Sequence, residues 1–260
     1  MPEHMFGASD HADSAGHPWA GRSFEPNAHA SDDGSAPEAL RLAVESFHAG
    51  DGDYLAIVEA IRESRLLIPL VAEAGDIGFT DEGLKVDKTQ ELSIVTVATP
   101  DGRTALPLFS SVEAMRTWNP EARPVPADGI RAALAAAGEG TPVIVLDAGS
   151  SSQVVLRRPA IWAIAKSEPF VPAHLDERIA ATIAVSADVE PAVHAIALRN
   201  GDPHADLSGP DLEIELTLDP GLDQEQLNAL LQRVVTSWQA DPYFTEHVDQ
   251  LALKVVPAEA

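Results

Sequence analysis

The chain contains 260 residues, of which 45% are hydrophobic, and its formal net charge is −24. The hydrophobic content is sufficient for a packed core, whereas the negative charge repels phosphate groups and argues against binding to nucleic acid or to an anionic membrane surface. Because the sequence has no cysteine, thiol catalysis, disulfide bonds and thiolate metal sites are excluded.

Residues 1–36 are rich in Gly, Ala, Ser, Asp and His and lack a periodic apolar pattern, which predicts a disordered tail. The histidines of this tail fit neither one helix face nor a compact loop, so we expect no metal site there. They are His4, His11, His17 and His29. The N-terminus lacks a secretory signal pattern, and no apolar run approaches the roughly 18 residues of a transmembrane helix. We therefore expect a cytoplasmic protein.

Two helices are predicted next. Pro37 suits the start of a helix, and Gly50 ends its apolar stripe. Asp53 is placed to cap the second helix. We therefore interpret Gly50–Asp53 as a C-cap followed by an N-cap, because the segment is too short for a calcium-binding EF-hand loop.

A buried strand is predicted at Arg65–Ala72, where Pro69 indicates an edge strand or a bulge. The acidic, glycine-containing segment 73–90 predicts a loop. A hairpin follows, because the alternating run at Leu92–Val97 and the apolar run at Thr104–Phe109 flank a turn signal.

A short helix and a rigid loop come directly after the hairpin. Ser110 and Glu113 have the spacing of a capping box, and the helix should end near Asn119 because Pro120 disfavours helical geometry in the residue before it. Arg123–Pro126 should be extended, since its two prolines fix φ and lack N–H donors.

The rest of the first domain is predicted to alternate helices and strands. Asp128 should cap an alanine-rich helix that ends near Ala137. Strands are expected at Pro142–Asp147 and Val154–Arg158 and a helix at Ala160–Lys166. The two prolines of Glu168–Pro172 indicate a linker.

The second domain should begin with a helix whose apolar stripe is Leu175, Ile179 and Ile183. A strand is expected at Ala192–Arg199, and apolar residues alternate with acidic ones and a threonine over residues 212–218, as in a sheet covered on one face. The longest helix and a last strand follow, and this order predicts an antiparallel sheet packed against helices. The fold class is therefore α+β, with two small α/β-sandwich-like domains at residues 37–170 and 173–257 and mixed or antiparallel sheets.

The segment from Leu106 to Pro126 resembles the N-terminal domain of the SseB family, named for enhanced serine sensitivity. The matching residues are Leu106-Pro107-Leu108-Phe109, Ser110-Ser111, Glu113-Ala114, Trp118-Asn119-Pro120 and Arg123-Pro124-Val125-Pro126. Ser64–Val71 and Val143–Gly149 fit the same domain in order, so the resemblance covers roughly residues 37–169 and continues more weakly beyond. It implies a fold and no established catalytic mechanism.

Trp118, Asn119 and Arg123, which we call the ledge residues, are the candidate binding site for a protein partner, because tryptophan and arginine dominate binding hot spots. The alternative is that Trp118 belongs to the core while Asn119 and Arg123 hold the loop.

Asp202, His204 and Asp206 are the sequence's most ligand-like cluster, since carboxylates and histidine at alternate positions could bind a cation. The glycines and proline of the same loop are equally typical of an ordinary connection.

No motif for phosphate binding, dinucleotide binding, a zinc helix or a nucleophile elbow is present. Helix capping accounts for at least one of Ser110 and Ser111, so neither is expected to be a nucleophile. We therefore predict a non-enzymatic adaptor or regulatory module without a cofactor. The alternative is a metal- or carboxylate-dependent enzyme with its site in the 202–206 loop.

Overall fold

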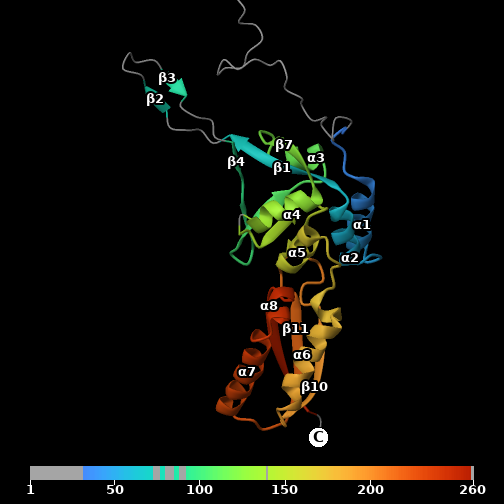
Figure 1. Cartoon of the computed structure of the whole chain (residues 1–260), viewed down its shortest axis with the longest axis vertical. Helices are drawn as coiled ribbons and strands as arrows, with labels where there is room; N and C mark the ends of the chain where they lie inside the picture. Colours follow the sequence, from blue (N-terminus) through green and yellow to red (C-terminus); the bar gives the residue numbers. More distant parts are fainter. Residues whose placement is uncertain (1–31, 73–76, 80–84, 88–91, 139, 259–260) are drawn as a thin grey trace, which may run out of the picture. The chain divides into compact units, whose positions relative to one another are not determined.

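The computed structural model describes residues 32–72, 77–79, 85–87, 92–138 and 140–258. Residues 34–260 form one compact unit, and Figure 1 shows its helices and strands. Most of the predicted tail 1–36 and much of segment 73–90 lie outside the described residues. No helix among the residues described here is long and apolar enough to cross a membrane.

The first two helices are α1 (Glu38–Ala49) and α2 (Tyr54–Arg62). Gly50 takes the left-handed conformation with φ 79° after α1, and the Asp53 carboxylate accepts the N–H of Ala56 at 2.8 Å. Both predicted caps are thus confirmed.

The first sheet has the order β4-β1-β7, formed by Leu92–Ile94, Arg65–Ala72 and Arg123–Asp128. Both outer strands are antiparallel to β1. The expectation that Pro69 marks an edge strand or a bulge is wrong, because β1 is the central strand.

Local pairing explains why this central strand tolerates a proline. The N–H of Leu67 donates to the carbonyl of Phe109 at 2.8 Å, on the side of β1 away from β7. Pro69 faces the same side, two residues on, and β4 pairs only from Leu70 onward. Pro69 therefore lies between the residue that pairs with Phe109 and the residues that pair with β4, where no partner strand needs its N–H.

The second sheet has the order β5-β6-β8-β9. Its strands are Val97–Ala98, Thr104–Leu108, Val143–Leu146 and Val154–Arg157. The pairing of β5 with β6 confirms the predicted hairpin, while β6 and β8 are parallel. The loop predicted at 73–90 contains two short antiparallel strands, β2 (Ile77–Phe79) and β3 (Lys85–Asp87).

Three more helices accompany these sheets: α3 (Val112–Trp118), α4 (Gly129–Gly138) and α5 (Arg158–Lys166). The cap of α3 is Ser111, whose hydroxyl accepts the N–H of Ala114 at 3.0 Å. The expected role of Ser110 as this cap is wrong by one residue, because the Ser110 side chain instead bonds the buried Asp147.

The last part of the chain is η1 (Ala173–Leu175), α6 (Glu177–Asp188), β10 (Val193–Arg199), β11 (Leu212–Leu218), α7 (Gln224–Gln239), α8 (Pro242–His247) and β12 (Leu251–Pro257). The sheet order is β10-β11-β12. The sheet is mixed rather than antiparallel, because β11 and β12 are parallel and are joined through α7 and α8.

The alternation along β11 is confirmed, since every second residue is buried against α6 and α7 in one apolar cluster. Leu175, however, is 65% exposed and does not extend the stripe of Ile179 and Ile183. Asp176 explains the difference: it caps α6 through the N–H groups of Arg178 and Ile179, so the helix begins after Leu175.

Apolar residues on either side of residue 170 gather mainly in separate clusters. Two residues of the 200–210 segment, Ala205 and Leu207, pack instead with the clusters of the first part. The division into domains at residues 37–170 and 173–257 stays a prediction, and the fold class α+β is confirmed.

Candidate functional site

The ledge residues lie at the end of α3 and the start of β7. Trp118 is half-buried, and its ring centroid is 5.3 Å from that of the buried Phe109. The side chain of Asn119 accepts the N–H of Glu121 at 2.9 Å, so it holds the loop. Arg123 is exposed. Both interpretations of Trp118, as a core residue and as a surface binding residue, therefore hold in part, because one part of its ring packs in the core and another part lies at the surface.

The strand β7 beside the ledge is an edge strand with a blocked outer side. Leu67 uses its backbone groups to bond Phe109 on the far side of β1, so Leu67 and the opposite Pro126 share no cross-strand hydrogen bond. The same holds two residues along, where Pro69 lies opposite Pro124. Two of the three N–H positions that point outward from β7 are therefore prolines, and the third is Asp128 at the end of the strand. A partner strand would find few donors on this edge.

The 202–206 loop does not bring its three candidate ligands together. Asp202 is 6% exposed, whereas His204 and Asp206 are exposed residues, and Asp206 accepts the N–H of Ser208 at 2.9 Å. The Asp202 carboxylate pairs with the guanidinium of Arg157 at 2.6 Å and accepts the N–H of Leu207 at 3.0 Å. Within the described part of the chain, no group of three histidine or acidic residues could hold a metal ion.

This loop is a tightly folded docking segment. A Cβ on Gly201 or Gly209 would collide with backbone atoms of the same loop, and Ala205 and Leu207 adopt positive φ values of 49° and 65°. The carbonyl of Ala205 accepts the N–H of Val155 at 2.8 Å, which attaches the loop to β9. Side chains on both sides of this bond are buried.

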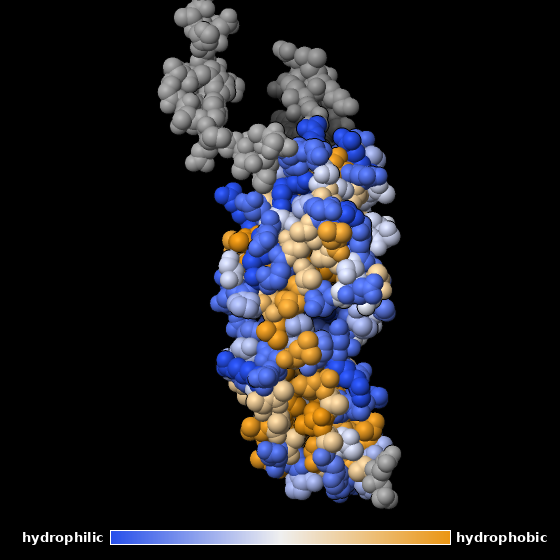
Figure 2. Space-filling model, turned by 90° about the vertical axis from the view of Figure 1, so that its right-hand side faces the viewer, coloured by the Kyte–Doolittle hydropathy of each residue, from blue (hydrophilic) through white to orange (hydrophobic). Residues whose placement is uncertain are grey.

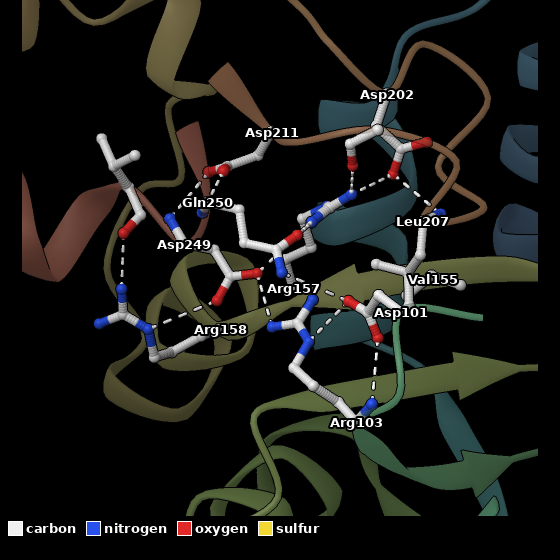
Figure 3. A network of polar contacts seen from close by, with 12 residues as sticks. Asp101, Arg103, Val155, Arg157, Arg158, Asp202, Leu207, Asp211, Asp249 and Gln250 are labelled. Carbon is white, nitrogen blue, oxygen red and sulfur yellow. Dashed lines mark hydrogen bonds and ion pairs between the residues drawn. The ribbon is translucent and has the colours of Figure 1, made fainter. Parts of the chain in front are cut away.

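Around the loop, three arginines of the first part of the chain bind acids and carbonyls of the second part (Figure 3). Arg103 pairs with Asp249 at 2.8 Å, and Arg157 donates to Gln250 at 3.0 Å. Arg158 donates to the carbonyls of Thr245 and Val248 at 2.8 and 2.6 Å. We call this set, with Asp101, Asp202 and Asp211, the junction network.

Asp211 differs from the other acids of the junction network. Its two oxygens accept the backbone N–H groups of Asp249 and Gln250, at 3.0 and 2.6 Å. Burial raises the pKa of Asp211, and these two hydrogen bonds oppose the shift. Among the described residues it has no ion-pair partner, so its charge is stabilised by these two backbone N–H groups and by the more distant Arg157.

A cavity of about 310 Å³ opens beside Asp211. We call it the junction cavity. Its wall is mostly apolar and includes Phe47, Tyr54 and Phe170, whose rings contact one another in sequence at centroid distances of 6.3 and 5.8 Å. His174 also lines the wall, and burial lowers its pKa. Sequence reasoning missed this site, because its wall is formed by residues from five separate segments of the chain.

A second buried acid, Asp147, lies close to the start of α3. The Asp147 carboxylate accepts the N–H and the hydroxyl of Ser110, both at 2.7 Å, and the hydroxyl of Ser152 at 3.2 Å. Burial raises the pKa of Asp147, against the effect of these bonds. The Ser110 hydroxyl thus acts as a donor to a carboxylate, which is a structural role.

The outer side of α6 carries exposed apolar side chains. Val185 and Val189 are 68% and 74% exposed, and the exposed Ala181 lies one turn before Val185, with the exposed Arg178 and Asp188 beside them. Figure 2, which presents the side of the molecule where α6 lies in Figure 1, shows apolar side chains gathered over this half of the chain. Sequence reasoning followed Ile179 and Ile183 and overlooked the valines, although their spacing of four residues was visible.

Residues 39–163 match the family model of the SseB protein N-terminal domain. The match covers both sheets that carry the ledge and the arginines of the junction network. Residues 39–163 are therefore identified as an SseB N-terminal domain, and the resemblance that the motif residues predict is confirmed for this part of the chain. No curated protein and no solved structure matches the chain.

Proposed function

We propose that this protein is a non-enzymatic binding module that acts through a protein partner. The observation that carries the proposal is the pair of exposed valines at the C-terminal end of α6, Val185 and Val189, which are 68% and 74% exposed. Contiguous exposed apolar surface of this kind is typical of protein–protein contacts. The ledge offers a second, smaller surface around Trp118.

The polar groups support a role without catalysis. Asp202 is the buried acid of the 202–206 loop, and its carboxylate is bound to Arg157. Asp147 is the buried acid beside Ser110, and its carboxylate is bound to the Ser110 hydroxyl. Both acids are therefore held by structural partners. A general base must instead reach a substrate proton directly. The alternative of a metal- or carboxylate-dependent enzyme at the 202–206 loop therefore gains no support from the contacts of Asp202.

The test is affinity purification of the full chain from the cells that produce it, with the bound proteins quantified for variants of each surface. V185S/V189S should lose most of a stoichiometric partner if α6 is the contact, and Trp118→Ala should lose it if the ledge is. Trp162→Ala is the matched control, because Trp162 is a second half-exposed tryptophan, on α5.

Two results would contradict the proposal. One is a stoichiometric partner that stays bound to every variant. The other is reproducible turnover of a substrate by the purified protein that a single alanine substitution abolishes.

A further inference from the structure

The junction cavity has the size and lining of a small-molecule site. Its volume of about 310 Å³ lies at the lower end of the roughly 300–1,000 Å³ usual for ligand pockets, which fits a compact organic compound. The rings of Phe47, Tyr54 and Phe170 form a continuous aromatic wall, and such mostly apolar clefts with few polar groups are the usual form of ligand sites.

The cationic donor of the wall is already used. Arg157 donates to Asp202, Gln250 and the carbonyl of Gly209, and it also lies 3.5 Å from Asp249. The hydroxyl of Tyr54 donates to the carbonyl of Val155 at 2.9 Å. An anionic ligand would therefore find no free charged donor on Arg157, and Tyr54 would have to give up an internal hydrogen bond.

The aspartates of the junction network, in contrast, outnumber its arginines. The junction network contains three arginines and four aspartates, and its ion pairs engage Asp101, Asp202 and Asp249. Asp211 is the aspartate that no arginine of the described chain pairs with, and it lines the cavity. Each of its oxygens accepts one backbone N–H, which leaves a further lone pair on each. His174 stays neutral at pH 7, since burial lowers its pKa, and so does not repel a cation.

We propose that the junction cavity binds a small organic ammonium ion, with its apolar body against the aromatic wall and its ammonium group at Asp211. Aromatic faces attract cations, and hydrogen bonds between an ammonium and a carboxylate are about twice as strong as neutral ones. A metal ion is disfavoured here, because the described residues contain no group of three or more histidine or acidic side chains that could hold one. Binding of such an ion in the junction cavity is independent of the exposed valines of α6 and of the ledge.

Three probes of nearly equal shape test the charge preference: 2-phenylethylamine, 2-phenylethanol and phenylacetate. Each is titrated calorimetrically into the full chain at pH 7. We expect the protonated amine to bind at least tenfold more tightly than phenylacetate, with the alcohol between them. Equal or tighter binding of phenylacetate, or no binding of the amine, would overturn the proposal.

Asp211→Asn tests whether the carboxylate of Asp211 is the group that binds the ammonium. It should weaken binding of the amine about tenfold and leave the alcohol within about twofold, since only the amine uses the carboxylate charge. Asp223→Asn is the matched control, because Asp223 is an exposed helix cap that asparagine can replace. Unchanged amine affinity in Asp211→Asn would contradict the site.

A measurement on the wild-type chain guards against a variant that folds poorly. In amide NMR spectra, 2-phenylethylamine should shift signals of residues 52–55 and 173–175, which line the cavity. Shifts confined to the exposed ends of β10–β12 would place the amine elsewhere and refute the assignment.

Discussion

In the 200–210 loop and at the ledge, the burial of side chains is the opposite of what the residue types suggest. The loop is rich in polar and small residues, yet it buries Asp202, Ala205 and Leu207 against the SseB domain. The ledge carries a large aromatic residue, yet Trp118 keeps part of its ring at the surface. The difference lies in the partner: a buried arginine makes burial of Asp202 possible, whereas Phe109 covers only one side of Trp118.

The largest effect is expected where the loop is anchored. Arg157→Met leaves Asp202 buried without its counter-ion, and breaking a buried pair in this way costs about 3–5 kcal/mol of the free energy of unfolding. Urea denaturation followed by circular dichroism measures the loss. Arg199→Met is the control, because its pair with Glu215 is exposed at 3.4 Å and should contribute about 0–1 kcal/mol. Equal losses in the two variants would show that the loop does not depend on this charge.

The ledge should respond more weakly. Trp118→Ala removes a half-buried ring, so we expect a loss of roughly 2 kcal/mol, below the ~3–5 kcal/mol usual for a buried large aromatic. Trp238 supplies that upper reference within the same chain, since it is completely buried and donates to Ser186 at 2.5 Å. Denaturation of both alanine variants gives the ratio. A cost for Trp118→Ala within about 0.5 kcal/mol would make the ledge a purely exposed anchor.

Asp147 should make the free energy of unfolding fall as the pH rises. Burial raises the pKa of Asp147 above its ordinary value of 3.8, so its stabilising contribution is complete below that pH and is lost as the pH rises through the folded pKa. Relative to Asp147→Asn, the wild type should therefore lose stability as the pH rises above about 4. Asparagine tolerates the positive φ of 50° at this position.

Asp241 is the matched acid, because its pKa is lowered whereas that of Asp147 is raised. A hydrogen bond from the Thr182 hydroxyl is the main cause that lowers its pKa, and the backbone N–H of Tyr243 adds to the shift. A lowered pKa gives stability that is present above the ordinary pKa and is lost as the pH falls through the folded one. Wild type and Asp241→Asn should therefore converge in acid, whereas wild type and Asp147→Asn diverge as the pH rises. The same slope in both comparisons would contradict the burial of Asp147.

Local features could be predicted from the sequence, because their causes lie within a few residues. Asp53 caps its own helix, and the alternation over residues 212–218 reports which side chains of β11 face the helices. The family resemblance also followed from local motif residues. The cap of α3 was placed one residue early because Ser110 and Ser111 are equally suitable by type, and only the distant Asp147 engages the first of them.

Contacts between distant segments could not be predicted in the same way. Arg157 and Asp202 are 45 positions apart, and nothing local to the 202–206 loop distinguishes a buried ion pair from a ligand set. One signal was available: Arg157 continues a fully apolar strand, where a charged residue needs a buried partner. The junction cavity had no such signal, since no single segment forms its wall.

The smallest change in stability, with a clear effect on association, is expected at the edge of β7. Pro124 and Pro126 occupy the positions whose N–H groups would point away from β1, so they protect this edge against strand pairing. P124V/P126V restores both donors and keeps an extended backbone, and it should alter the free energy of unfolding by no more than about 0.5 kcal/mol. Sedimentation velocity should then reveal concentration-dependent self-association that the wild type lacks. Val125→Thr on the same strand is the control, because it changes an exposed side chain without adding a backbone donor. If P124V/P126V stays as monodisperse as this control, the prolines serve the loop geometry of the ledge rather than the protection of its edge.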